Sequence, residues 1–150
     1  MSEASNPAIF SSCLLLEDDQ AHAMLVTRGV KELVTRIHHV KSVREAVAAL
    51  QKENFEVIIT DLKLPDSPEG RPVQHLAGLA KGTPIVVLTS STSLEDAVAA
   101  MKEGASDYIV KNFDSNFREI LSFTLSRVKR EIETQKERSR IQREMEILRV

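Results

Sequence analysis

The chain has 150 residues, a length that fits one domain with a hydrophobic core. Its 20 basic and 22 acidic side chains give a net charge of −2, which argues against a surface for direct nucleic-acid binding, and 42% hydrophobic residues argue against disorder. No apolar run approaches the ~20 residues of a membrane span and the amino terminus lacks a signal-peptide pattern, so we expect a cytoplasmic location.

Short apolar runs alternate along the chain with segments of helical spacing. Residues 1–11 show no periodicity and are expected to form a loose leader. The runs predict strands at 13–16, 37–40, 57–59, 85–88 and 108–110. The segments between them predict helices at 23–33, 43–50, 73–79 and 94–101. Gly82 and Gly104 follow the third and fourth of these helices, where a left-handed residue often ends a helix.

This alternation is typical of an α/β fold. Five strand and helix units in ~120 residues predict a doubly wound, five-stranded parallel sheet in the flavodoxin-like order 2-1-3-4-5. Apolar residues at spacings of three and four from Phe117 to Ile132 predict a fifth helix that docks on the sheet. The charged segment 128–150 contains no Gly or Pro, so we expect a long C-terminal helix.

The apolar pattern of that helix changes phase. Ile132 and Ile141 lie nine residues apart, which puts them on opposite faces of a straight helix. The tail is therefore expected to fold back, to form a homodimer as a stuttered coiled coil, or to serve as a signalling helix that leads to an effector domain beyond Val150. A frayed, solvated tail is the alternative. Because the chain ends within the helical pattern, we expect it to be a fragment of a longer regulator.

Polar side chains follow four of the five predicted strands. An acidic run at residues 17–19 follows the first, Asp61 the third, Thr89 the fourth and Lys111 the fifth. The carboxyl ends of parallel strands meet at one edge of the sheet, so these groups should lie together. Clustered carboxylates repel one another unless a cation binds, and their oxygens suit Mg²⁺. A carboxylate nucleophile with a metal, a lysine and a hydroxyl is the set that phosphoryl transfer needs.

Residues 12–127 resemble the receiver domain of bacterial two-component response regulators. Each matching feature is weak alone, but the order and spacing together are specific. The matches are Glu17 and Asp18 after the first strand, Asp61 within the stretch 58–66, Thr89 followed by Ser90, and the stretch 104–108 before Lys111.

The resemblance implies that Asp61 is the phosphoacceptor and takes a phosphoryl group from a histidine kinase or a phosphotransfer protein. It implies Mg²⁺ bound by Asp18, Asp61 and the backbone carbonyl of Lys63, with Glu17 binding directly or through water. Lys111 and Thr89 would contact the phosphate. The only catalysis implied is Mg²⁺-dependent self-phosphorylation and autodephosphorylation. Asp19 is instead expected to cap the first helix.

The family also implies how the signal leaves the site. Thr89 is expected to move toward the phosphate and Tyr108 to rotate inward, which changes the surface of the fourth helix, the fifth strand and the fifth helix. Output would then pass through this face and the C-terminal helix. The alternative for Tyr108 is a ring that simply packs at the sheet edge.

Two positions depart from the family pattern. Asn112 follows Lys111, where many receivers have a proline in a cis bond, so neither the conformation of the Lys111–Asn112 bond nor the aim of the Lys111 side chain is predicted. Lys63 lies two residues after the acceptor, and in this family the side chains there and at Ser91 tune dephosphorylation. The phosphate lifetime is therefore not predicted.

Three other functions are the alternatives to a receiver domain. An aspartate-based phosphohydrolase has a second aspartate two residues after its nucleophile, where this chain has Lys63. A nucleotide- or flavin-binding domain would need a glycine- or hydroxyl-rich loop where residues 17–19 are acidic. A degenerate receiver that acts only as an interaction module is the third alternative. Cys13 is expected to be a core residue, and the four histidines are assigned no catalytic role.

Overall fold

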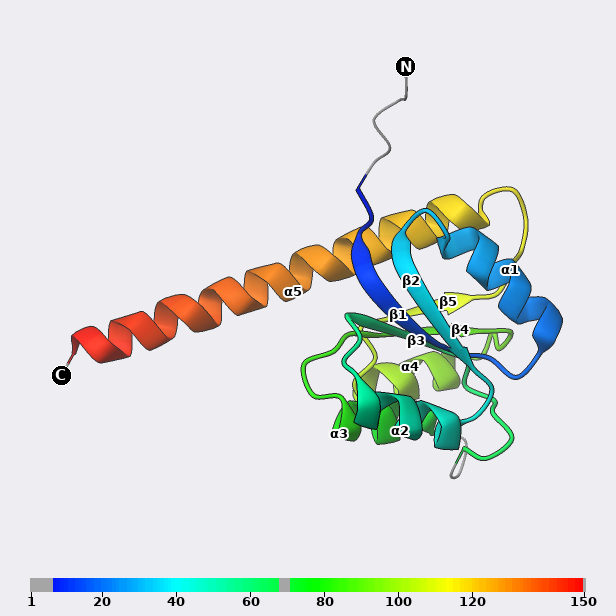
Figure 1. The fold of residues 1–150 in the computed structure, drawn as a ribbon, viewed down its shortest axis with the longest axis horizontal. Helices are drawn as coiled ribbons and strands as arrows, with labels where there is room; N and C mark the ends of the chain where they lie inside the picture. Colours follow the sequence, from blue (N-terminus) through cyan, green and yellow to red (C-terminus); the bar gives the residue numbers. More distant parts are fainter. Residues whose placement is uncertain (1–6, 68–70, 150) are drawn as a thin grey trace, which may run out of the picture.

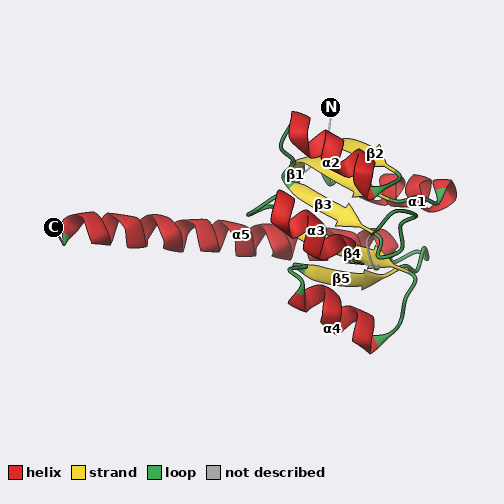
Figure 2. Ribbon diagram, turned by 90° about the horizontal axis from the view of Figure 1, so that it is seen from below, coloured by secondary structure: helices red, strands yellow, loops and turns green. Residues whose placement is uncertain are grey.

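In a computed structural model, which describes residues 7–67 and 71–149, the chain forms a parallel sheet with helices on both faces (Figures 1 and 2). The sheet has the order β2-β1-β3-β4-β5. This confirms the predicted fold class and strand order. The elements are β1 (Phe10–Leu16), α1 (Gln20–Val30), β2 (Val34–Val40), α2 (Val43–Lys52), β3 (Val57–Thr60), α3 (Pro72–Leu79), β4 (Ile85–Thr89), α4 (Leu94–Lys102), β5 (Asp107–Val110) and α5 (Phe117–Leu148).

The alternation of side chains along each strand divides the core in two. One cluster joins Cys13 and Leu15 of β1 to α1 and α5, and the other joins Leu14 and Leu16 to α2, α3 and α4. Both faces of β1 are therefore covered, as its continuous apolar run predicts. The burial of Cys13 is confirmed, and burial raises the pKa of its thiol to about 12.

Several boundaries lie three residues from the predicted ones; β2, for example, begins at Val34 and not at residue 37. β1 begins at Phe10, inside the segment expected to be a loose leader, while residues 1–6 lie outside the described part of the chain. α1 ends at Val30 and not at residue 33, because Leu33 turns the chain: its carbonyl accepts hydrogen bonds from Ile9 and Phe10, at 2.8 and 3.2 Å.

Local sequence explains where several helices begin and end. The Asp19 carboxylate accepts a hydrogen bond from the backbone N–H of His22 at 3.0 Å, which confirms the predicted cap of α1. Ser42 and Ser93 cap α2 and α4 in the same way. Gly82 and Gly104 have φ angles of 85° and 119°, so the predicted left-handed turns after α3 and α4 are present.

The last helix leaves the domain. Its first part packs on α1 and the sheet as far as Val128, and the rest projects away from the domain as a continuation of the same helix (Figure 1). The tail does not fold back, because α5 is unbroken to Leu148 and the side chains from 140 to 149 are exposed. None of the described helices is both long and apolar enough to cross a membrane.

Candidate functional site

Parallel pairing brings four strand ends to one edge of the sheet. Leu16 is paired with Thr60, so the residues that follow them, Glu17 and Asp61, lie side by side. The N–H of Asp61 donates to the carbonyl of Leu16 at 3.1 Å. On the other side of β3, the N–H of Lys111 donates to the carbonyl of Thr89 at 2.7 Å. The strand arrows in Figure 2 point to this edge.

Three carboxylates meet at this edge. Glu17, Asp18 and Asp61 each offer an oxygen, and these oxygens lie within 4.8 Å of one another. Glu17 and Asp61 are 2% and 8% exposed, whereas Asp18 is open to solvent. Buried carboxylates at this separation repel one another strongly, so the cluster needs positive charge. A set of hard oxygen donors, one of them facing solvent, fits Mg²⁺.

Lys111 provides a positive charge between two of these carboxylates. Its Nζ atom lies 2.5 Å from Glu17 Oε1 and 2.7 Å from Asp61 Oδ2, and its side chain is 3% exposed. Burial by itself lowers the pKa of the Lys111 ammonium, but the hydrogen bonds and charges of Asp61 and Glu17 outweigh this effect and raise the pKa above its usual 10.5. The lysine is therefore charged at neutral pH.

Backbone groups hold the two buried carboxylates in place. Asp61 Oδ1 accepts hydrogen bonds from the N–H groups of Leu62 and Lys63, at 2.7 and 3.3 Å. The other oxygen of Asp61 is left to face Lys111. Glu17 Oε2 accepts from the N–H of Asp19 at 3.1 Å. Asp61 is thus a fixed carboxylate, oriented from one side by the chain and from the other by a cation.

Thr89 and Tyr108 are linked through the loop that joins β4 to α4. Thr89 is buried at the end of β4, and its Oγ1 accepts a hydrogen bond of 3.4 Å from the N–H of Ser91. The Tyr108 hydroxyl donates to the carbonyl of Ser91 at 3.1 Å, and the ring is half-buried. A single residue, Ser91, therefore joins the two side chains.

Two histidines with no predicted catalytic role, His22 and His39, also lie at the site. His22 Nδ1 is 3.0 Å from Lys111 Nζ, and His39 Nε2 is 2.7 Å from the backbone carbonyl of Glu17. His22 occupies the first turn of α1, three residues after the cap Asp19. In the sequence, the closeness of His22 to the acidic run 17–19 is the only indication that its side chain faces the site.

Asn112 does not prevent Lys111 from reaching the carboxylates. Within residues 7–67 and 71–149 no peptide bond is cis, so the bond between Lys111 and Asn112 is trans. The Lys111 side chain nevertheless contacts both Glu17 and Asp61.

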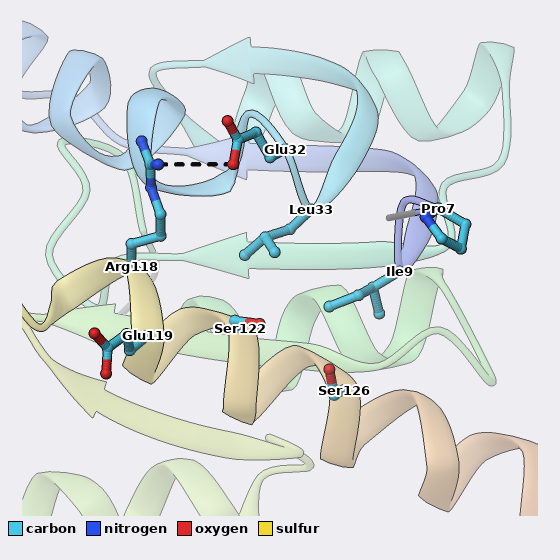
Figure 3. A pocket seen from close by; sticks show the side chains of 8 residues that line it. All are labelled: Pro7, Ile9, Glu32, Leu33, Arg118, Glu119, Ser122 and Ser126. Atoms are coloured by element: carbon cyan, nitrogen blue, oxygen red, sulfur yellow. Dashed lines mark ion pairs between the residues drawn. The ribbon is translucent and has the colours of Figure 1, made fainter. Parts of the chain in front are cut away.

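A cavity of about 680 Å³ lies elsewhere, between the start of α5 and the residues that precede β1 and β2 (Figure 3). It contains an ion pair of 3.6 Å between Arg118 and Glu32. Serine hydroxyls and apolar side chains form much of the remaining lining, and the carboxylates at the sheet edge are not part of it. Its lining residues are Pro7, Ile9, Glu32, Leu33, Arg118, Glu119, Ser122 and Ser126.

Comparison with known proteins agrees with this geometry. Residues 13–121 match the family described as response regulator receiver domain. The chain is 35% identical over 109 residues to the transcriptional regulatory protein HprR of Escherichia coli (strain K12), covering 73% of this chain and 48% of that protein. It is 33% identical over 110 residues to the response regulator protein PilR of Pseudomonas aeruginosa, covering 73% of this chain and 24% of that protein. The chain therefore spans less than half the length of these relatives.

A solved structure extends the likeness to the fold. The chemotaxis response regulator CheY4 of Vibrio cholerae superimposes with a TM-score of 0.68 at 30% sequence identity. The match covers 79% of this chain and 98% of that one.

Proposed function

Because the chain belongs to the family of response regulator receiver domains, we propose that Asp61 accepts a phosphoryl group from the phosphohistidine of a histidine kinase or a phosphotransfer protein. The observation that carries the proposal is the Lys111 ammonium held between the buried carboxylates of Glu17 and Asp61, with Asp18 beside them. This arrangement presents one oriented carboxylate oxygen next to a fixed positive charge.

In the proposed step, a carboxylate oxygen of Asp61 attacks the phosphorus atom of the phosphohistidine. An O–P bond forms, the N–P bond breaks, and the imidazole of the donor leaves with the electron pair of that bond and takes up a proton. Lys111 stays beside the phosphoryl oxygens and compensates their charge, and the Thr89 hydroxyl donates a hydrogen bond to one of them. Asp61 then carries an acyl phosphate.

A Mg²⁺ ion would be held by Asp18, by Asp61 and by the backbone carbonyl of Lys63, with Glu17 binding directly or through water. The ion supplies positive charge that stabilises the transferring phosphoryl group. The clustered carboxylate oxygens support this assignment because Mg²⁺ prefers oxygen ligands. Glu17 is also engaged by Lys111 and by the N–H of Asp19, which favours its binding through water.

We further propose that Thr89 and Tyr108 carry the signal away from Asp61. The link from Thr89 through Ser91 to Tyr108 supports a coupled movement of the two side chains. The surface they would change is the α4-β5-α5 face, where apolar side chains are exposed in an arrangement that suits a protein partner. These side chains are Leu94, Val98 and Met101 of α4, Val110 of β5, and Ile120 and Phe123 of α5.

The projecting part of α5 is the second route of output in this proposal. Ile141, Met145 and Leu148 form an exposed apolar stripe at spacings of four and three, which supports pairing of two copies along this helix. The relatives HprR and PilR are longer regulators, so an effector domain beyond Val150 is also proposed. We propose residues 12–127 as the receiver domain and residues 128–150 as its helical extension, acting in the cytoplasm without direct nucleic-acid contact.

The two alternative functions have less support. A phosphohydrolase would need a second carboxylate two residues after Asp61, and that residue is the exposed Lys63. A degenerate receiver would lack part of the acidic cluster or its lysine, and both are present.

Phosphoryl uptake from acetyl phosphate tests the proposed function. The intact mass of the wild-type chain should rise by one phosphoryl group in Mg²⁺, and it should not change in EDTA. The matched variant Asp61→Asn, which keeps the size of the side chain, should show no gain in either condition. A phosphoryl group that persists in Asp61→Asn, or no uptake by the wild-type chain, refutes the acceptor assignment.

A further inference from the structure

The ammonium of Lys111 has three described partners. Two are the carboxylates of Glu17 and Asp61, and the third is the imidazole Nδ1 of His22 at 3.0 Å. A lysine ammonium carries three hydrogens and has no acceptor, so three partners match its donors one to one. His22 is the one uncharged acceptor among them when its ring is neutral, and it comes from a different element, the first turn of α1.

We propose that His22 is a positioning residue that holds the Lys111 ammonium at the phosphorylation site. This inference rests on the proposed function of Asp61 and adds a residue to it. The two carboxylates are the groups that change when a cation binds or a phosphoryl group is transferred, whereas the imidazole takes no part in either event. The bond to His22 therefore persists while the partners on the other side of Lys111 change.

The direction of this hydrogen bond follows from the chemistry of the two groups. A charged lysine can only donate, so Nδ1 of His22 must be the acceptor and must carry no proton. The neutral ring then has its proton on Nε2, and the structure assigns His22 to the Nε2–H tautomer. This assignment does not depend on any phosphorylation step and can be tested by itself.

A second contact of the same ring acts on the chain just after Lys111. The His22 ring lies 5.3 Å from the ring of Phe113, and Phe113 lies 4.9 Å edge-on from Phe117, the first residue of α5. Phe117 is buried against Gly29 of α1, where an added Cβ would come within 3.0 Å of its ring. His22 thus holds Lys111 at its ammonium and also supports the loop that carries it.

Two substitutions separate these contacts. His22→Leu keeps an apolar body against Phe113 but removes the acceptor, whereas His22→Asn restores an acceptor oxygen bonded to Cγ, near the position of Nδ1. His75→Leu, which changes an exposed histidine of α3, is the matched control. We expect His22→Leu to lower the rate constant for phosphoryl uptake from acetyl phosphate about tenfold, which corresponds to ~1.4 kcal/mol. His22→Asn should recover most of this loss, and His75→Leu should match the wild-type chain.

The tautomer of His22 is a measurement that separates the two roles of the ring, because packing alone would not determine which nitrogen carries the proton. Long-range ¹H–¹⁵N NMR spectra of the histidine rings should show His22 with an unprotonated Nδ1 and a protonated Nε2 in the wild-type chain. Lys111→Met should remove this preference, while Lys81→Met, which changes an exposed lysine after α3, should keep it.

The outcomes are distinct. Equal uptake rates for His22→Leu and the wild-type chain overturn the proposal, and so do equally slow rates for His22→Leu and His22→Asn, because the acceptor would then make no difference. A protonated Nδ1 in the wild-type chain also overturns it. If the wild-type chain takes up no phosphoryl group, the proposed function fails, and the tautomer measurement still decides whether His22 holds Lys111.

Discussion

The Lys111 ammonium lies 2.7 Å from the Asp61 carboxylate, although the two residues are 50 positions apart in the sequence. The pair forms because β3 and β5 end at the same edge of the sheet, on either side of β4. The contact joins the proposed acceptor to the group that would compensate the charge of the phosphate. It also means that the site has positive charge of its own before any cation binds.

Removal of the positive charge of Lys111 should make the stability of the fold depend on Mg²⁺. We expect Lys111→Met to unfold more easily than the wild-type chain in EDTA, by about 3 kcal/mol, because Glu17 and Asp61 lose their buried partner. Added Mg²⁺ should restore more stability to Lys111→Met than to the wild-type chain. Urea unfolding followed by circular dichroism measures both effects, with Lys81→Met as control. Equal stabilisation of the two chains by Mg²⁺ would contradict the claim that Lys111 and Mg²⁺ compensate the charge of the same carboxylates.

Tyr108 offers a direct test of the proposed switch, since the chain has one tyrosine and no tryptophan. Its intrinsic fluorescence therefore reports the environment of this ring alone. Phosphorylation, or a beryllium fluoride mimic with Mg²⁺, should change the fluorescence as the hydroxyl leaves the Ser91 carbonyl. Thr89→Val should abolish most of the change, because it removes the hydroxyl that binds the phosphate. An unchanged signal in the fully phosphorylated chain would remove the switch role of Tyr108.

The sequence was informative wherever a local pattern determines the structure. Apolar runs predicted the strands, because a strand buried on both faces needs apolar side chains on both. Polar strand ends predicted the clustered carboxylates, because parallel strands end at one edge. The end of α1 was predicted too late, since Leu33 is apolar but packs in a turn and its carbonyl pairs with the start of β1.

The contact between His22 and Lys111 has only one weak local sign, the position of His22 three residues after Asp19. It spans 89 residues and depends on how α1 lies against the loop after β5. Periodicity shows which face of a helix is buried, but it does not show which side chain lies opposite. His39 lies on β2, and its contact with the Glu17 carbonyl depends on the pairing of β2 with β1, which the apolar pattern of the two strands does not show.

The loop after Asp61 should contribute to stability in a pH-dependent way. Asp66 accepts hydrogen bonds from the N–H groups of Val43 and Arg44, at 2.8 and 2.9 Å, and so caps α2 from another part of the chain. The bond from Arg44 is the main reason why the pKa of Asp66 lies below its ordinary value of 3.8. Asp66→Ala should lower the free energy of unfolding by ~1 kcal/mol at pH 7.

The pH range in which Asp66 stabilises the fold follows from the lowering of its pKa. A carboxylate with a lowered pKa in the folded state stabilises the fold above its ordinary pKa, and this contribution is lost as the pH falls through the folded value. The difference between wild type and Asp66→Ala should therefore be constant from about pH 7 to 5 and shrink below about pH 4. Urea unfolding across this range measures it. A difference that grows on acidification would contradict the proposed cap.

The stripe on the projecting helix predicts self-association. Replacement of Ile141 and Met145 by serine should shift the chain from dimer to monomer in sedimentation velocity experiments. Ile147→Ser is the matched control, because Ile147 is exposed on the same helix but lies off the stripe. A wild-type chain that stays monomeric at the highest attainable concentration would argue against pairing along α5.

The most direct test of the central claim is to identify the residue that carries the phosphoryl group. Borohydride reduces an aspartyl phosphate to homoserine, so the chain can be treated with acetyl phosphate and Mg²⁺, reduced, digested and sequenced by mass spectrometry. We predict homoserine at position 61 and at no other acidic position. Homoserine at Asp18, Asp19 or Asp66, with Asp61 unmodified, would contradict the account.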